Sequence, residues 1–458
     1  MKVIANYRDK YLKQAFRTID VPHDLDSVMD TDTEAEVASA TVGLSEDAVN
    51  NIWQACEDLY RSSVYPMMGF CLRHRGEIVL NRTLGESRPG ITAALDTPVG
   101  LHSASKAVSA VLIHLLAEQG HVNLLNPVSY YIPAFAAQGK GSITLQQLLS
   151  HSGGVPNVPE DTDIELLFDH DASLKMICAA APTNHQSRDQ AYHAVTSGFL
   201  FNELIKITTG LDAQQYLDRY IRKPMGMRYF RFGLTKREQA KVAHNSITGM
   251  DIKLINNALT GVLGADPDTV IAATNDARFF NAVIPSVNLY ATAEELSRFY
   301  QMLLNHGEWQ GKRILDPLTV HRATRPLDKT ELDRTLMLPM RYSAGMMLGG
   351  SPVGMYGKNT QYAYGHLGYS NILGWADPER DITVGLVNSG KPVIGPHMKA
   401  LPGFITKLSA ACEPFVDMAT DEPAYQRKPK PHSKSTPHKE HTYKRISARK
   451  RTPNRKTH

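Results

Sequence analysis

Apolar residues along this chain recur with two different periods, and the period changes from one segment to the next. After Ser45, a typical helix N-cap residue, apolar side chains follow at helical spacing at Val49, Ile52, Trp53, Cys56, Leu59 and Tyr60. Residues 67–72 and 77–82 have the pattern of two strands in a hairpin. Residues 106–119 return to helical spacing, and Gly120 is a typical helix stop.

The middle of the chain, from about residue 125 to 300, is mostly helical in pattern, with long loops. Residues 155–190 are polar and irregular, and loops of that length commonly line functional sites or are mobile. Strand patterns return at residues 371–376 and 382–388, around a turn at 377–380. Because strands occur near both ends, we predict one sheet built from both ends of the chain, with a helical region inserted between its halves.

Composition divides the chain into a body and a basic tail. Residues 426–458 contain 12 Lys or Arg and one acidic residue, a net charge of +11, whereas the rest has 38 basic and 45 acidic residues, a net charge of −7. Bulky apolar residues nearly vanish after Pro423, and such a segment cannot bury enough surface to fold. We therefore predict an N-terminal extension (1–44), a folded domain (45–418) and a disordered basic tail (419–458).

The basic tail has two interpretations. It is either a solvated extension or an arm that makes non-specific, salt-dependent contact with a polyanion such as nucleic acid or an anionic lipid surface.

Cysteine usage and the absence of targeting patterns indicate the compartment. The first residues contain no apolar stretch of signal-peptide length, and no run approaches the roughly 18 apolar residues of a transmembrane helix. The four cysteines lie far apart without a C-x-x-C pair, which favours reduced core residues. Asp169-His170-Asp171 has no further His or Cys at ligand spacing, so we interpret it as a solvated loop and not as a metal site. These observations predict a cytoplasmic protein.

Ser103-Ala104-Ser105-Lys106 is the first candidate for chemistry. Residues three apart share one helix face, so the Ser103 hydroxyl and the Lys106 amine can touch. In the first turn of a helix, the serine also lies beside backbone N–H groups without helical partners. The segment therefore offers a nucleophile, a base and part of an oxyanion hole, although S-x-x-K also occurs by chance in many helices.

Two further segments follow in order, Tyr192-His193-Ala194 and His366-Leu367-Gly368-Tyr369. With Ser103-x-x-Lys106, they resemble the motifs of the serine β-lactamase-related family, which includes class C β-lactamases, penicillin-binding D-peptidases and family VIII carboxylesterases. Residues 143–154, 224–227 and 374–378 resemble supporting segments of the same family. The resemblance covers about residues 45 to 412. It implies an α/β (α+β) fold of the β-lactamase/transpeptidase type, with a mainly antiparallel sheet.

The resemblance also implies roles. Ser103 would form an acyl-enzyme, and Lys106 and Tyr192 would relay its proton, with the choice of base between them left open. The backbone N–H groups of Ser103 and Tyr369 would form the oxyanion hole, beside Gly368, where backbone must approach substrate closely. No metal and no cofactor are implied. His151 is interpreted as a structural loop anchor.

Departures from the family pattern indicate the substrate. Ala194 stands where β-lactamases of this family have a side-chain amide that helps to hold the substrate. His366 stands where they have a lysine, a cation suited to the β-lactam carboxylate. Because a histidine is largely neutral at pH 7, His366 would bind that carboxylate more weakly. We therefore expect His366 to face the substrate of an enzyme that cleaves carboxylic esters of small molecules. Two alternatives stay open: a D-amino-acid peptidase or amidase with weak β-lactamase activity, and a non-catalytic scaffold or ligand-binding protein.

Overall fold

The computed structural model of the chain describes residues 16–155, 158, 162–183, 189–250, 260, 265–327 and 329–414. The predicted basic tail and its polyanion contact lie outside these residues. Within the described part, every helix is too short or too polar to cross a membrane. The four cysteines are buried and unpaired, as predicted.

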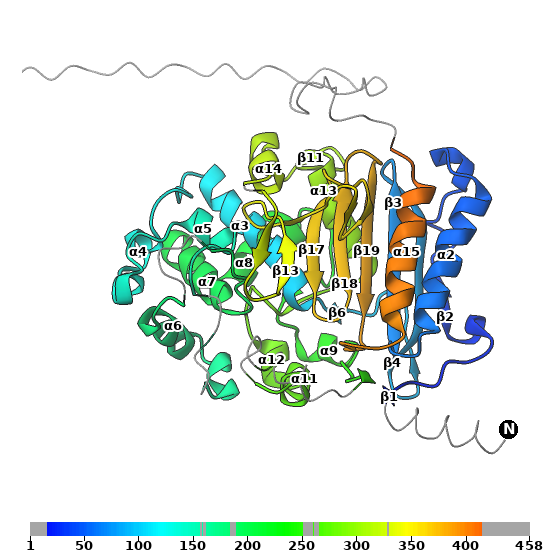
Figure 1. Ribbon diagram of the computed structural model, residues 1–458, viewed down its shortest axis with the longest axis horizontal. Coiled ribbons are helices and arrows are strands. Elements are labelled where there is room, and N and C mark those ends of the chain that lie inside the picture. The colour runs from blue at the N-terminus through cyan, green and yellow to red at the C-terminus, as the bar shows by residue number, and fades with distance from the viewer. Residues whose placement is uncertain are drawn as a thin grey trace, which may run out of the picture. The chain divides into compact units, whose positions relative to one another are not determined.

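An antiparallel sheet of eight strands forms the centre of the fold (Figure 1). Seven strands follow one another in the order β14 (Met347–Leu348), β17 (Tyr364–Gly368), β18 (Ile372–Asp377), β19 (Ile382–Asn388), β3 (Met67–His74), β4 (Glu77–Arg88) and β2 (Met29–Thr31), and β5 (Ile91–Thr92) pairs with β4. The register places Val384 of β19 opposite Leu72 of β3. The predicted sheet from both ends of the chain is therefore confirmed. β2 belongs to this sheet, although the sequence places it in an N-terminal extension.

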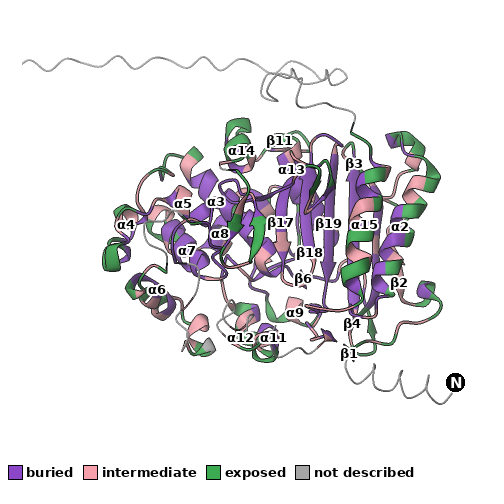
Figure 2. Ribbon diagram, viewed as in Figure 1, coloured by how far each residue is buried: buried purple, intermediate pink, exposed green. Residues whose placement is uncertain are grey.

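Helices cover both faces of this sheet. α2 (Glu46–Tyr60) and α15 (His397–Ala411) pack together on one face, where Phe404 meets Phe70 of β3 with ring centroids 5.2 Å apart. Ser45 caps α2, its side chain accepting from the Ala48 N–H, as the sequence predicts. Figure 2 shows that the strands are buried while the outer sides of α2 and α15 are exposed. Because α2 is buried on one side only, its apolar residues recur at helical spacing and polar residues occupy its exposed side.

α13 (Ala293–Leu304) lies against the other face, across β18, β19 and β3. Gly385 of β19 makes this approach possible, because a Cβ there would come within 2.2 Å of the Ala293 carbonyl oxygen.

Smaller strands pair beside the main sheet: β6 (Val99–Gly100) with β9 (Leu289–Ala291) and β7 (Arg231–Phe232); β12 (Glu331–Asp333) with β13 (Leu338–Met340); β10 (Glu308–Trp309) with β11 (Lys312–Arg313); β15 (Val353–Gly354) with β16 (Gly357–Lys358); and β1 (Phe16–Arg17) with β8 (Gly249–Met250).

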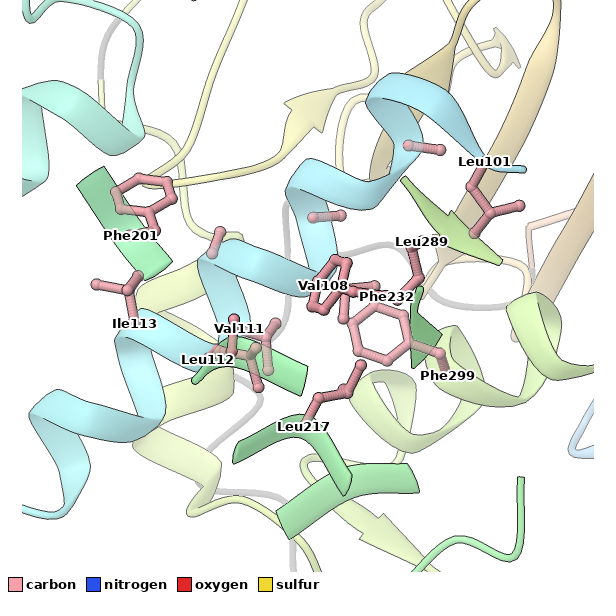
Figure 3. Packing of buried hydrophobic residues seen from close by; sticks show 14 of the residues in the cluster. Leu101, Val108, Val111, Leu112, Ile113, Phe201, Leu217, Phe232, Leu289 and Phe299 are labelled. Atoms are coloured by element: carbon pink, nitrogen blue, oxygen red, sulfur yellow. The ribbon is translucent and has the colours of Figure 1, made fainter. Parts of the chain in front are cut away.

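The helical region surrounds α3 (Ser105–Glu118), which is buried on nearly all sides. Figure 3 shows Val108, Val111 and Leu112 of this helix packing among side chains from several other elements. Its neighbours include Phe201 of α7 (Thr196–Thr209), Leu217 of α8 (Ala213–Leu217) and Phe299 of α13. A helix that is apolar all round needs such a location, because no side of it can face water favourably.

Shorter helices complete the region: α4 (Val128–Tyr131), α5 (Leu145–Leu149), α6 (His170–Ala179), α9 (Lys236–Gln239), α11 (Pro267–Thr274), α12 (Ala277–Asn281) and α14 (Pro317–Thr324), with the turns η1 (Leu25–Val28), η2 (Ser39–Val42), η3 (His102–Ala104), η4 (Pro133–Gly139), η5 (Ile164–Phe168) and η6 (Asp218–Arg222). The interpretation of Asp169-His170-Asp171 as a loop is wrong, because the segment begins α6, although both aspartates are exposed to solvent. Asp169 caps α6 by accepting from the Ala172 N–H, and His170 lies 3.2 Å from a Glu203 carboxylate oxygen.

Candidate active site

Ser103 lies at a sharp turn between β6 and the buried helix α3. The sequence places Ser103 and Lys106 on one helix, whereas the structure puts Ser103 in the 3-10 turn η3 and begins α3 at Ser105. His102, just before it, has a φ of +47°, a left-handed conformation that is uncommon for a residue with a side chain. This turn leaves Ser103 half-buried, with its side chain at the wall of a cavity.

Lys106 brings its amine to the Ser103 hydroxyl. Its Nζ lies 3.2 Å from Ser103 Oγ, and it donates to the carbonyl oxygens of Ala194 at 2.7 Å and Ser286 at 3.0 Å. The Lys106 side chain is buried, and this burial lowers its pKa well below the ordinary lysine value. Among the described residues, the hydrogen-bond partners of Nζ are therefore one hydroxyl and two backbone carbonyls.

Tyr192 is the third residue of this group. Lys106 Nζ lies 4.9 Å from the centre of the Tyr192 ring, and Tyr192 lines the same cavity as Ser103. Burial raises the pKa of the Tyr192 phenol above its ordinary value, and the neighbouring Ser103 side chain lowers it by a smaller amount. Among the described residues, no group meets strict hydrogen-bond geometry at the Tyr192 hydroxyl, and the Ser103 side chain interacts with it only more loosely. The fold thus brings the three predicted catalytic residues together.

The backbone of residues 192–194 is held at successive positions. The Tyr192 N–H donates to Asp333 Oδ1 at 3.2 Å, and the His193 N–H donates to His151 Nδ1 at 3.1 Å. His151 also packs its ring on Tyr192, with centroids 4.6 Å apart. Since Lys106 binds the Ala194 carbonyl, all three residues of the segment are fixed relative to Ser103.

Asp333 is a site residue that the sequence does not reveal. Its buried carboxylate accepts from the N–H groups of Thr335 and Leu336 as well as from Tyr192, and from the Tyr342 hydroxyl at 3.0 Å. It lies at the end of β12, 141 positions from Tyr192. An isolated aspartate beside a hairpin carries no motif, so only the folded contacts identify it.

Gly368 brings the end of β17 against the turn that carries Ser103. A Cβ at Gly368 would come within 2.4 Å of the Leu101 carbonyl oxygen, so only glycine allows this approach. The atom that Gly368 approaches closely is therefore in the protein's own backbone, whereas the sequence predicted a close approach to substrate. Tyr369 and Ser370, which follow, line the cavity beside Ser103. Tyr369, whose backbone N–H the sequence assigns to the oxyanion hole, therefore lies at the same cavity as Ser103.

His366 lies behind Tyr192 and is not among the residues that line the cavity. The centres of the two rings are 6.1 Å apart. His366 Nδ1 donates to the Leu367 carbonyl at 2.8 Å, while Nε2 is buried without a partner among the described residues. Burial and the nearby Lys106 lower its pKa to about 3. His366 is therefore neutral at pH 7 and supplies no positive charge to the site.

The cavity beside Ser103 has a volume of about 250 Å³. Its polar side is formed around Ser103, Tyr192 and Tyr369. The rest is mainly apolar. It includes Leu336 from the turn between β12 and β13, and side chains of the helical region that the sequence motifs do not reach: Phe168, Val270, Ala273, Phe279 and Ile284. No Lys, Arg, Asp or Glu occurs among the described residues that line it. Across the described chain, no group of three or more His, Cys, Asp or Glu side chains is arranged to hold a metal ion.

Known proteins resemble this chain in sequence and in fold. A profile of the Beta-lactamase family matches residues 49–400. The chain is 28% identical over 306 residues to the Mycobacterium tuberculosis protein named Esterase/beta-lactamase LipL, covering 64% of this chain and 70% of that protein. A penicillin-binding protein homolog from Caulobacter crescentus has a TM-score of 0.71 at 26% identity, covering 81% of this chain and 99% of that one.

A solved family VIII carboxylesterase has the same fold, with a TM-score of 0.69 at 24% identity over 79% of this chain and 98% of that one. The family profile spans most of the sequence, and the antiparallel sheet with its inserted helical region agrees with the solved structures. The chain therefore belongs to the Beta-lactamase family and is a serine hydrolase.

Proposed function

We propose that this hydrolase cleaves carboxylic esters through an acyl-enzyme on Ser103, with Lys106 and Tyr192 moving the proton. One observation carries the proposal: a buried amine lies 3.2 Å from a serine hydroxyl at the wall of an apolar cavity. A nucleophilic serine needs an adjacent base, and this geometry supplies one.

The contacts of Lys106 support its assignment as the base. A neutral amine has two N–H groups and one lone pair. The carbonyls of Ala194 and Ser286 accept both N–H groups, which leaves the lone pair for the proton of the Ser103 hydroxyl. The lowered pKa of Lys106 favours this neutral form. Tyr192 keeps its own proton because its pKa is raised, which suits a proton donor to the leaving group.

The reaction then proceeds in two balanced halves. Ser103 Oγ attacks the ester carbonyl as its proton moves to Lys106, and the oxyanion accepts from the backbone N–H groups of Ser103 and Tyr369. The tetrahedral intermediate collapses, Tyr192 protonates the departing alkoxide, and Lys106 returns a proton to Tyr192. Water attacks the acyl-enzyme with the same groups in reversed roles, which releases the acid and restores Ser103.

Esters are favoured over β-lactams and D-peptides by the charge of the site. Substrates of the latter two classes carry a carboxylate, and burying it without a cation is unfavourable. His366 is neutral, and no cationic side chain occurs among the described residues of the cavity wall. The name of the Mycobacterium tuberculosis relative includes both esterase and beta-lactamase, so weak β-lactam turnover is the second activity to test.

Labelling with a fluorophosphonate tests the catalytic role of Ser103. We expect the wild type to become labelled and Ser103→Ala to remain unlabelled. Ser105→Ala is the matched control, because the Ser105 hydroxyl accepts from the Leu289 N–H inside the core. An unlabelled wild type would favour the non-catalytic scaffold, and equal labelling of Ser103→Ala would show that Ser103 is not the nucleophile.

Parallel assays with p-nitrophenyl butyrate and a chromogenic cephalosporin test the substrate class. We expect a higher kcat/KM for the ester. Faster turnover of the cephalosporin would contradict the esterase proposal while leaving Ser103 as the nucleophile.

A further inference from the structure

We propose that His102 is a positioning residue that holds the two backbone N–H donors of the oxyanion hole at a fixed separation. This inference rests on the proposed ester hydrolysis, in which those donors belong to Ser103 and Tyr369. His102 belongs to none of the motifs that indicate the reaction. The proposal is carried by its place beside Ser103, by the contact of its ring with Tyr369 and by its buried polar neighbour.

Two turns meet at the oxyanion hole through consecutive pairs of residues. Leu101 and Gly368 meet through their backbones, because a Cβ at Gly368 would come within 2.4 Å of the Leu101 carbonyl oxygen. His102 and Tyr369 meet through their rings, whose centroids lie 6.0 Å apart at an interplanar angle of 67°, an edge-to-face contact. His102 is thus joined to Ser103 by a peptide bond and to Tyr369 by its ring.

The backbone conformation of His102 does not by itself call for a histidine. Its φ of +47° lies in the left-handed region, which glycine adopts without strain. The side chain is nevertheless an imidazole, buried at the wall of the cavity that Ser103 also lines. The reason for a histidine at this position therefore lies in what its ring contacts.

Asn245 gives the imidazole a second fixed neighbour. Burial lowers the pKa of His102 well below its ordinary value, so the ring is neutral at pH 7, and the Asn245 side chain raises that pKa by a smaller amount. His102 Nε2 and Asn245 Oδ1 are buried, and no described group meets either atom with strict hydrogen-bond geometry. A neutral ring with its proton on Nε2 supplies the donor that Asn245 Oδ1 lacks.

Asn245 is itself held in place. Its Nδ2 donates to Thr274 Oγ1 at 3.0 Å, and its backbone N–H donates to Asn275 Oδ1 at 2.9 Å. Thr274 is the last residue of α11, and Asn275 follows it. The His102 ring therefore has one neighbour anchored at the end of a helix and another that carries an oxyanion donor.

Displacing an oxyanion donor should slow the reaction without weakening substrate binding. The negative charge on the carbonyl oxygen develops only as the serine attacks, so the donors act more strongly on the transition state than on the bound ester. Misplacing a reacting group by about 1 Å costs about 100-fold in rate. A loss in kcat with little change in KM therefore distinguishes a positioning role from a role in substrate binding.

Steady-state kinetics with p-nitrophenyl butyrate and inhibition by butylboronic acid test the proposal. In His102→Ala we expect kcat to fall about 10- to 100-fold with KM nearly unchanged. The inhibition constant should rise by a similar factor, because the boronic acid forms a tetrahedral adduct with the serine and places an oxygen in the oxyanion hole. His102→Phe keeps an aromatic ring beside Tyr369 and should restore part of both properties.

His74→Ala is the matched control. His74 of β3 is also buried and also has a ring nitrogen without a partner among the described residues, but it does not line the cavity. We expect wild-type kcat and inhibition in this variant. Thermal melting of each variant verifies that it is folded. If His102→Ala does not fold, His102→Asn takes its place, because asparagine is among the residues that most often adopt a positive φ.

A double-mutant cycle tests whether His102 acts through Tyr369. If it does, the loss of kcat in the double variant of His102→Ala and Tyr369→Ala should be smaller than the product of the two single losses. Losses that multiply would show that the two residues act independently, and would overturn the proposed positioning of Tyr369.

The remaining outcomes separate this inference from the proposed function. Wild-type kcat and inhibition in a folded His102 variant, a change confined to KM, or an equal loss of kcat in His74→Ala each overturn the positioning role alone. Failure of the wild type to hydrolyse any ester, together with no fluorophosphonate labelling, overturns the proposed function itself.

Discussion

At the scale of single residues, the site depends on a buried lysine beside a serine. Lys106 has its pKa lowered by burial, and its hydrogen-bond partners among the described residues are a hydroxyl and two backbone carbonyls. Tyr192 contributes a buried phenol that no described group meets with strict hydrogen-bond geometry. Groups of this kind are unfavourable for folding, and in the proposed mechanism they lie where the proton moves.

Removing either proton-transfer group should lower turnover without unfolding the protein. We expect Lys106→Ala and Tyr192→Phe each to reduce kcat by about 100-fold or more, the usual contribution of a general acid or base. Steady-state kinetics with p-nitrophenyl butyrate measures the loss, and circular dichroism checks the fold. A folded variant with the wild-type rate would remove that residue from the mechanism.

Lys106 should also make stability depend on pH. Its folded pKa lies below the ordinary value of 10.5, so the unfolded chain binds this proton at pH values where the folded protein does not. The free energy of unfolding therefore rises with pH between these two pKa values. In Lys106→Met this rise should be smaller, by up to about 1.4 kcal/mol per pH unit.

Urea unfolding of both proteins at about pH 7.5 and about pH 9.5 measures the difference in slope. Lys391, a second buried lysine with its pKa lowered to about 7, is present in both proteins and contributes equally. Equal slopes for the wild type and Lys106→Met would contradict a lowered pKa at Lys106.

At the scale of elements, the hairpin of β12 and β13 holds the segment that carries Tyr192. Asp333 joins the two, because its carboxylate accepts from the Tyr192 N–H and from two N–H groups of its own turn. The same hairpin contributes Leu336 to the cavity wall. The distance between Tyr192 and Ser103 therefore depends on an element remote from both in sequence.

Replacing Asp333 should affect stability and turnover together. Asp333→Ala leaves several buried donors without an acceptor, and each costs about 1–3 kcal/mol of unfolding free energy. It also frees the Tyr192 backbone, so kcat should fall more than KM rises. Asp333→Asn keeps an acceptor oxygen and should restore part of both properties.

Urea unfolding and steady-state kinetics of the Asp333 variants give these values. Asp24→Ala is the control, because Asp24 also accepts from a backbone N–H but is exposed and does not line the cavity, so water can replace it. Wild-type unfolding free energy and kcat in Asp333→Ala would show that the hairpin does not position Tyr192.

At the scale of the whole chain, the family profile ends at residue 400 and the described residues end at 414. The two interpretations of the basic tail predict different results for its removal. Deleting residues 424–458 should leave kcat/KM for p-nitrophenyl butyrate unchanged. If the tail contacts polyanions, the full chain should bind heparin more tightly at low salt than at high salt, and the truncated chain should not. A large loss of ester hydrolysis would make the tail part of the catalytic unit.

Local patterns in the sequence predicted much of this architecture. The hairpin of β3 and β4, the cap at Ser45, the strand β19 and the helix after Ser103 all follow from spacings of two to four residues, and such spacings are written directly in the chain. The spacing of Ser103 and Lys106 is also local, and the contact it predicts is present even though Ser103 lies in a 3-10 turn.

Long-range packing decided the rest. The pairing of β19 with β3, the contact of Asp333 with Tyr192, the location of His366 behind Tyr192 and the apolar wall at Ala273 join residues that are far apart in the chain. No local pattern encodes such contacts, because they depend on which surfaces the core brings together. The sequence by itself determined the local elements and predicted the residues that we propose carry the chemistry. Only the tertiary structure decided what surrounds them, and hence the charge of the site and the shape of the cavity beside Ser103.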